Sequence, residues 1–120
     1  MQPTFVQKIT VQESQTAAVY GSGLLPVYAT PALIALMENT AMQMIDLPEG
    51  CSSVGIAISV KHLKASAVGE EITCKATLTE VEDRKYTFSI QANDSTGDII
   101  GEGIHERFVV NVEKFLGKLK

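Results

Sequence analysis

The sequence predicts an α+β protein in which a curled antiparallel sheet of five strands wraps around one long central helix. One segment carries apolar residues at helical spacing, and five segments alternate polar and apolar residues in the manner of strands. A single helix must therefore cover the apolar face of the whole sheet. Because a helix of about 16 residues is roughly 24 Å long but only about 10 Å wide, it can do so only if the sheet curls around it.

The predicted helix extends from Thr30 to Asp46. Thr30 is a good N-cap, Pro31 suits the first helical position, and the helical pattern stops at Pro48 and Gly50. Apolar residues recur between these signals and cover most of the circumference, which indicates a buried helix. They are Leu33, Ile34, Leu36, Met37, Ala41, Met42, Met44 and Ile45.

Glu38 interrupts this apolar surface. It lies in the same row of the helix as Ile34, Met42 and Ile45, where ionisation of a carboxyl group is costly. A charged residue at such a position is the first indication of a functional site. The structural alternative is a buried ion pair between Glu38 and Arg107.

Strand patterns precede and follow the helix. Residues 14–28 are expected to form an irregular loop, and residues 113–120 a short amphipathic tail. Turns at 82–84 and 94–97 lead us to expect that the four strands after the helix form an antiparallel meander. The five predicted strands are residues 5–12, 53–63, 71–81, 85–93 and 98–112.

The strand at 53–63 carries a second candidate. Its predicted apolar face consists of the alternating residues Val54, Ile56, Ile58 and Val60. His62 continues this face, so His62 and Glu38 should point into the same layer, where an imidazole and a carboxylate are suited to proton transfer. A strand-end histidine that is half in solvent is the simpler interpretation.

The last strand places two further polar residues on one face. His105 and Arg107 share this face, and Glu106 lies on the other. Gly101 and Gly103 come just before them, which indicates a bulge or a close approach of another part of the chain.

Composition and charge exclude several classes of function. The chain has 120 residues, so one domain is expected over residues 1–120, and a net charge of −4 without a basic stripe argues against nucleic acid as a partner. No apolar run approaches the roughly 18 residues of a membrane span, and the N-terminus does not resemble a signal peptide, which predicts a cytoplasmic protein without a membrane partner. Cys51 and Cys74 are expected to be reduced thiols, with Cys74 packed. Two histidines without further ligands at suitable spacing predict no metal site.

The predicted sheet leaves one edge strand with unpaired backbone groups. Such an edge promotes association unless something covers it. Pairing of the same edge in two copies, which forms one longer sheet, is a common solution. We therefore expect a homodimer.

Five short motifs occur along the chain: Tyr28–Pro31, Leu36–Glu38, Gly55–His62, Gly103–Phe108 and Glu113–Phe115. Together, in this order and spacing, they resemble the fluoroacetyl-CoA thioesterase-like family of hotdog-fold proteins. The resemblance implies a hotdog domain that hydrolyses a small acyl-CoA thioester to the free acid and CoA at a dimer-interface site. It also implies that the coenzyme A thioester is the substrate and that no other cofactor takes part.

The resemblance further implies a set of site residues. The catalytic threonine, glutamate and histidine of the family correspond to Thr30, Glu38 and His62. Gly55 and Arg107 match family positions that line the site. Members that discriminate fluoroacetyl-CoA carry an additional lid with phenylalanines, whereas the loop before Thr30 is short here and has none. The resemblance therefore implies an acyl-CoA substrate without naming the acyl group.

Two roles are open for Glu38. It can attack the thioester carbonyl directly and form an acyl anhydride, or it can deprotonate the attacking water. Amide groups near Ala32 and Leu33, in the first helical turn, suit the oxyanion. Thr30 and Glu38 are roughly 12 Å apart along the helix axis. Either Thr30 of one protomer serves Glu38 of the other, or Thr30 contacts the thioester and not Glu38; without the resemblance, Thr30 is most simply a helix cap.

Two other functions remain open. One is a hotdog hydratase or dehydratase acting on acyl thioesters, and the other is a non-catalytic dimer that binds acyl-CoA. Such hydratases typically pair Asp with His, whereas here the helix carries Glu38, and a binding module would be expected to lack Glu38 or His62. Lysines available for the phosphates of CoA, or simply solvated, are Lys61, Lys64, Lys114, Lys118 and Lys120.

Overall fold

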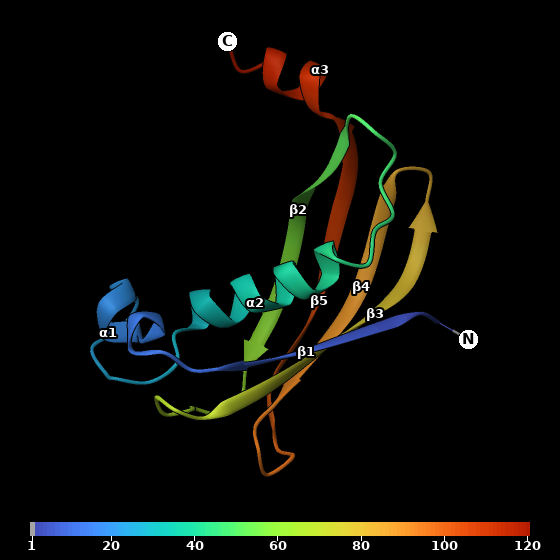
Figure 1. Ribbon diagram of the computed structural model, residues 1–120. Coiled ribbons are helices and arrows are strands. Elements are labelled where there is room, and N and C mark those ends of the chain that lie inside the picture. The colour runs from blue at the N-terminus through green and yellow to red at the C-terminus, as the bar shows by residue number, and fades with distance from the viewer. Residues whose placement is uncertain (1) are drawn as a thin grey trace.

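One curled antiparallel sheet with a helix across its concave side is the central feature of the structure, a computed structural model that describes residues 2–120 (Figure 1). The helix, α2, spans Thr30–Met42. The strands are β1 (Thr4–Thr10), β2 (Cys51–His62), β3 (Glu71–Glu82), β4 (Lys85–Asn93) and β5 (Ile99–Asn111). The short helical segments are η1 (Glu13–Gln15), α1 (Ala17–Tyr20) and α3 (Val112–Gly117). The predicted arrangement of five strands around one long helix is confirmed.

The strand order is β1-β3-β4-β5-β2, and each neighbouring pair is antiparallel. The predicted meander is correct for β3, β4 and β5 but wrong for β2, which pairs with β5 instead of β3. The connection after β2 explains this. The N–H groups of Leu63 and Lys64 donate to the carbonyl of Ile100 at 2.7 and 3.3 Å, and Ala67 then bridges to Val27, so the chain leaves the sheet before β3 begins. β1 and β2 are therefore the two edges of the sheet.

The helix begins and ends differently from the prediction. Ala29 holds the N-cap position without a side-chain bond, and Thr30 is already helical, so the prediction that Thr30 caps the helix is wrong. The predicted end at Asp46 is also too late. The N–H of Met44 donates to the carbonyl of Ala41 at 3.0 Å, and this shorter i→i+3 bond tightens and ends the last turn.

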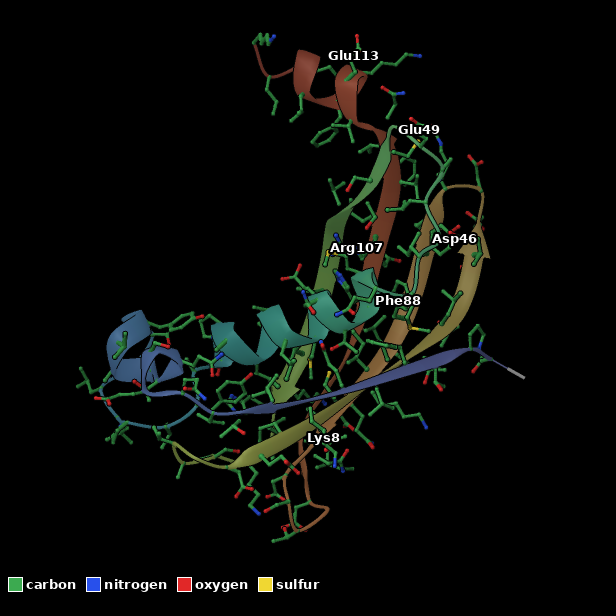
Figure 2. All side chains as sticks on the ribbon, in the orientation of Figure 1. Lys8, Asp46, Glu49, Phe88, Arg107 and Glu113 are labelled. Atoms are coloured by element: carbon green, nitrogen blue, oxygen red, sulfur yellow. The ribbon has the colours of Figure 1, made fainter. Side chains whose placement is uncertain are left out.

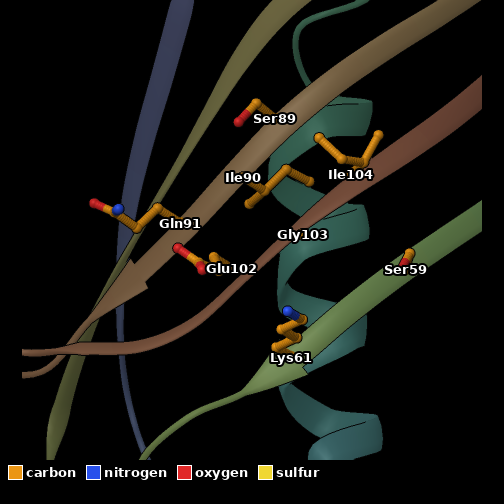
Figure 3. A pocket seen from close by; sticks show the side chains of 8 residues that line it. All are labelled: Ser59, Lys61, Ser89, Ile90, Gln91, Glu102, Gly103 and Ile104. Carbon is orange, nitrogen blue, oxygen red and sulfur yellow. The ribbon is translucent and has the colours of Figure 1, made fainter.

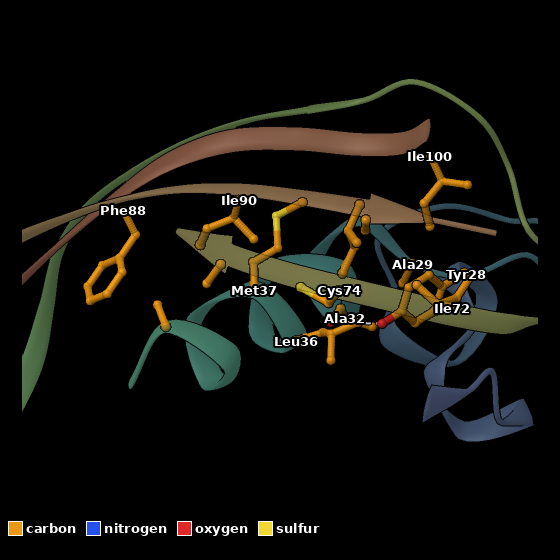
Figure 4. Close-up of a cluster of buried hydrophobic side chains, with 14 of the residues drawn as sticks. Tyr28, Ala29, Ala32, Leu36, Met37, Ile72, Cys74, Phe88, Ile90 and Ile100 are labelled. Carbon is orange, nitrogen blue, oxygen red and sulfur yellow. Dashed lines mark hydrogen bonds between the residues drawn. The ribbon is translucent and has the colours of Figure 1, made fainter. Parts of the chain in front are cut away.

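The hydrophobic core lies between α2 and the concave side of the sheet (Figure 4). The buried residues of α2 are Ala32, Leu33, Leu36, Met37, Thr40 and Ala41. The neighbouring row is not covered, because Ile34 and Glu38 are only half-buried and Met42 is 40% exposed. The prediction of a buried helix is therefore wrong for the row that carries Glu38. Cys74 is fully buried in the core, as predicted.

A β-bulge in β2 changes which of its residues face the helix. The register against β5 shifts between Gly55 and Ala57, so Ile56 is the extra residue, and its side chain is 51% exposed. The predicted apolar face is correct from 58 to 62 but wrong at Val54 and Ile56. Strict alternation would have turned Gly55 away from α2, and the bulge turns it toward the helix.

The segment between β1 and α2 is more regular than the loop predicted for residues 14–28. Thr16 caps α1, because its Oγ1 accepts a hydrogen bond from the N–H of Val19 at 3.4 Å. Gly21, with a φ of +78°, ends this single turn in the left-handed conformation. Capping at both ends lets a short helix form where hydrophobic periodicity is too brief to reveal it.

Candidate functional site

Thr30 and His62 form one part of the site, which we call the rim pair. Thr30 Oγ1 and His62 Nδ1 are 2.8 Å apart, and this contact joins the first residue of α2 to the last residue of β2. Burial lowers the pKa of His62, so the imidazole is neutral at pH 7. Its Nε2 is buried and has no hydrogen-bond partner within residues 2–120. The rim pair lines a hollow of about 290 Å³ together with Tyr28 and Lys64.

Glu38 reaches from α2 to the backbone of β2. A Cβ atom added to Gly55 would lie 2.9 Å from Glu38 Oε2 and 3.5 Å from Arg107 Nη1. The carboxylate and the guanidinium therefore both approach the position where Gly55 has no side chain. A side chain here would force the end of Glu38 to shift, so the glycine lets the carboxylate keep this place. We call Glu38, Gly55 and Arg107 the central group.

Arg107 is held in a fixed position from three directions. Its Nε donates to Ser53 Oγ and its Nη2 donates to the Ser53 carbonyl, both at 2.9 Å, and its Nη1 lies 3.2 Å from His105 Nε2. Arg107 projects from β5 on the side of the sheet where α2 lies (Figure 2). Burial lowers the pKa of Arg107, and the charge of Glu38 opposes this effect. Arginine nevertheless stays protonated at neutral pH.

The predicted site residues thus fall into two separate groups. No hydrogen bond between described residues joins the rim pair to the central group. Thr30 and Glu38 stand eight residues apart on α2, which is roughly 12 Å. Glu38 and His62 both face the concave side of the sheet, as predicted, but the structure brings His62 to Thr30 and not to Glu38. No direct ion pair joins Glu38 to Arg107 among residues 2–120, so the structural alternative for Glu38 is not supported.

Two members of the site were missed in the sequence. The prediction that His105 shares a face with Arg107 is confirmed, but neither His105 nor Ser53 was assigned to the site. The alternation around Arg107 was a signal that could have identified His105. Ser53 gave no such signal, because the bulge sets which residues of β2 face the helix.

Backbone geometry removes one of the two expected oxyanion donors, Leu33, and leaves Ala32 a prediction. The N–H of Leu33 donates to the carbonyl of Ala29 at 3.0 Å, so this amide is already engaged in the helix. The close approach predicted at the glycines of β5 is confirmed. A Cβ at Gly101 would lie 2.7 Å from Leu33 Cδ2, and one at Gly103 would collide with the carbonyl oxygen of Ser59.

The predicted phosphate-binding lysines do not gather around Glu38. Lys64 Nζ donates to Asp94 Oδ2 at 2.6 Å and to Asp98 Oδ2 at 2.8 Å, and these carboxylates raise the pKa of Lys64. Lys61 lines a hollow on the convex side of the sheet, with α2 behind the strands (Figure 3). Lys114 lines a third hollow beside α3. None of these hollows includes a residue of the central group.

The described residues hold neither a metal cluster nor a membrane-spanning helix. Within residues 2–120, no three histidine, cysteine or carboxylate side chains gather in a way that could hold a metal ion. The same residues contain no helix with the length and apolar character needed to cross a bilayer.

Comparisons with known proteins agree with this arrangement. The family described as fluoroacetyl-CoA-specific thioesterase (FlK) matches residues 11–113. The fluoroacetyl-CoA thioesterase of Streptantibioticus cattleyicolor is 38% identical over 96 residues, which cover 78% of this chain and 68% of that protein. A solved structure of the thioesterase FlK superposes with a TM-score of 0.93 at 31% identity, covering 99% of this chain and 93% of the other. A hot-dog-like protein from Thermanaerovibrio acidaminovorans superposes with a TM-score of 0.90 at 27% identity, covering 98% and 88%. The predicted hotdog fold is confirmed.

Proposed function

Because this chain belongs to the fluoroacetyl-CoA-specific thioesterase family, we propose that it hydrolyses a small acyl-CoA to the free acid and CoA at a site shared by two copies of the chain. One observation carries the proposal: the half-buried Glu38 carboxylate lies over Gly55 beside the buried guanidinium of Arg107. A carboxylate in this position can activate the attacking group, and a fixed cation can stabilise the developing oxyanion. The coenzyme A thioester is the substrate, and the proposal requires no other cofactor.

Glu38 can promote hydrolysis of the thioester in two ways, as a general base or as the nucleophile. In the first, Glu38 removes a proton from water, the water oxygen bonds to the carbonyl carbon, and the C–S bond breaks to release CoA thiolate, which takes up the proton. In the second, a Glu38 oxygen bonds to the carbonyl carbon as the C–S bond breaks and CoA leaves as the thiolate. Water then hydrolyses the resulting anhydride, which releases the acid and restores the Glu38 carboxylate, and the thiolate takes up the proton lost by water. Gly55 leaves the space in which the carbonyl can approach the carboxylate.

The rim pair supplies a second polar contact for the substrate. The Nε2 of neutral His62 has no hydrogen-bond partner among residues 2–120, and its Nδ1 is 2.8 Å from the hydroxyl of Thr30. In the proposal, the Thr30 hydroxyl contacts the thioester and His62 orients that hydroxyl. This role needs an acceptor or donor on the substrate within hydrogen-bond reach.

The proposed homodimer is supported by the uncovered surfaces beside the site. Among the described residues, β2 is an edge strand whose one partner is β5, and Ile56 and Met42 are 51% and 40% exposed. Pairing β2 with its counterpart in a second copy would cover both side chains and the open row of α2. It would also bring the rim pair of one copy near the central group of the other. Within one copy, these two groups are separated by roughly 12 Å along the helix.

Release of free thiol from a panel of acyl-CoAs tests the proposal. The panel extends from acetyl-CoA through branched and aromatic acyl groups to medium chains, with Glu38→Gln beside the native protein. We expect turnover of some members and a loss of about 10²- to 10⁴-fold in kcat in the variant, the usual contribution of a catalytic acid or base. The melting temperature and the elution volume on a sizing column serve as the control for folding and assembly.

Two results would overturn the proposal. A native protein that binds acyl-CoA but releases no thiol would be a binding module. Addition or loss of water at an acyl chain, with the thioester intact, would identify a hydratase or dehydratase.

Two statements stay predictions from the sequence. They are that residues 1–120 form one domain and that the protein is cytoplasmic.

A further inference from the structure

His105 is a buried histidine with a complete set of partners. Its side chain is 1% exposed, and its ring stacks on Phe88 with centroids 6.4 Å apart and planes inclined by 30°. Nδ1 lies 2.9 Å from the carbonyl oxygen of Ala57, and Nε2 lies 3.2 Å from Arg107 Nη1. Each ring nitrogen therefore has a partner that can act only as an acceptor or only as a donor.

These two partners determine where the ring proton sits. A carbonyl can only accept and a guanidinium N–H can only donate, so Nδ1 carries the hydrogen and Nε2 offers a lone pair to Arg107. An added proton on Nε2 would face the N–H of Arg107 and remove this bond. Burial lowers the pKa of His105, and the charge of Arg107 lowers it further, against opposing effects of Ala57 and of the carboxylates Glu38 and Glu106.

The charged groups around the ring come from few elements. Glu38 approaches from α2, and Arg107 and Glu106 belong to β5 itself. β4 contributes the uncharged ring of Phe88, and β2 contributes the carbonyl of Ala57. The guanidinium is the group in direct contact with the imidazole, so the neutral ring is favoured at pH 7.

His105 therefore contacts both the bulged part of β2 and the guanidinium of Arg107. Ala57 follows the bulge that turns Gly55 toward α2, and a Cβ at Gly55 would lie 3.2 Å from His105 Cε1. Ser53 restrains Nε and Nη2 of Arg107, which leaves Nη1 as the nitrogen beside Glu38. Only His105 restrains Nη1 among the described residues.

We propose that His105 is a positioning residue: as the neutral tautomer with hydrogen on Nδ1, it accepts from Arg107 Nη1 and fixes the guanidinium beside Glu38 for thioester hydrolysis. This inference rests on the proposed function, because its effect on turnover exists only if the site hydrolyses thioesters. His105 has no contact with the open surface and acts through Arg107. A small displacement of such a group is enough to slow a reaction substantially.

A pair of amide substitutions separates the two ring nitrogens. The longer side-chain amide introduced by His105→Gln can place an acceptor near the position of Nε2, whereas His105→Asn keeps a polar group near Nδ1 and removes the contact with Arg107. We expect His105→Asn to lower kcat about 10- to 100-fold with little change in KM, and His105→Gln to retain most of the native kcat. Equal losses in the two variants would contradict a specific role of Nε2.

Two further variants separate positioning from stability. Phe88→Leu removes the stacked ring but leaves both hydrogen bonds of His105, so it should lower the melting temperature while kcat is kept. If His105 acts through Arg107, then adding His105→Asn to Arg107→Lys should cost no further activity, because the two residues are coupled. Additive losses, or a kcat loss in Phe88→Leu equal to that in His105→Asn, would overturn the positioning role.

A spectroscopic measurement tests the tautomer without any assay of activity. The ¹⁵N chemical shifts of the His105 ring in the native protein should report hydrogen on Nδ1 at pH 7 and at pH 6. Hydrogen on Nε2, or an imidazolium at pH 7, would overturn the inference. A native protein with this tautomer but no thiol release would overturn the proposed function instead. An active protein whose kcat is unchanged by His105→Asn would overturn only the positioning role.

Discussion

The rim pair and the central group are supported by the fold to different extents. The rim pair consists of one contact of 2.8 Å between an exposed threonine and a half-buried histidine. In the central group, Arg107 is 7% exposed and is held by Ser53 and His105 through three contacts. Arg107 of the central group is therefore preorganised within one copy of the chain, whereas Thr30 of the rim pair is open to solvent.

The difference also bears on the proposed homodimer. Glu38 stands on a row of α2 that the sheet does not cover, beside the unpaired edge of β2. The rim pair stands at the beginning of the same helix, roughly 12 Å away. An acyl thioester is a compact group, so one reacting carbonyl cannot touch both within a single copy. Two copies remove this difficulty if each site combines the rim pair of one with the central group of the other.

Mixing two inactive variants is the strongest test of this combination. Glu38→Gln and His62→Ala each disable every site of their own homodimer. After mixing and subunit exchange, half of the dimers contain one of each chain, and each of these has one intact site, so about a quarter of the native activity should return. Thiol release before and after mixing measures this. If the rim pair and the central group of the same copy formed each site, no activity would return.

Gly55→Ala should damage the central group and leave the rim pair intact. The added Cβ would lie 2.9 Å from Glu38 Oε2 and 3.2 Å from His105 Cε1, and the carboxylate would have to move. We expect a loss of about 10²-fold in kcat, measured by thiol release. Gly117→Ala is the matched control, because a Cβ there meets nothing within 4 Å. Unchanged kcat in Gly55→Ala would mean that the position of Glu38 over β2 is irrelevant to the reaction.

The smallest expected effect is on stability at mildly acidic pH. Burial lowers the pKa of both His62 and His105 from the ordinary value of 6.5, so the unfolded chain binds these protons more tightly than the folded protein. The free energy of unfolding should therefore be highest above pH 6.5 and fall as the pH drops toward the folded-state pKa values. Melting temperatures at pH 7.5 and 5.5 should differ by a few degrees.

The two histidines can be compared in the same measurement. His105→Gln should reduce the pH dependence more than His62→Gln, because His105 is the more buried and faces a cation. Asp94 does not interfere, since its pKa lies below its ordinary value of 3.8. A melting temperature that rises on acidification would contradict the assignment of neutral rings.

Much of the fold was predictable because it depends on local pattern. The alternation in residues 85–93 predicts β4 with its observed bounds, and α2 begins one residue before the predicted first helical position, Pro31, because Ala29 is the cap. Glu38 was identifiable because a carboxylate interrupts an apolar row. The resemblance added Gly55 and Arg107, for which composition and periodicity give no functional signal.

The sequence by itself determined the five strands and the long helix, the polarity of most strand faces and the presence of a carboxylate on the central helix, since these depend on residues that are neighbours along the chain. Only the tertiary structure decided that β2 pairs with β5, that the bulge turns Gly55 toward Glu38, and that Ser53 and His105 hold Arg107. Each of these results joins residues that are distant in the sequence. Periodicity within one strand carries no information about the register of its partner, and a one-residue shift exchanges the faces of the strand.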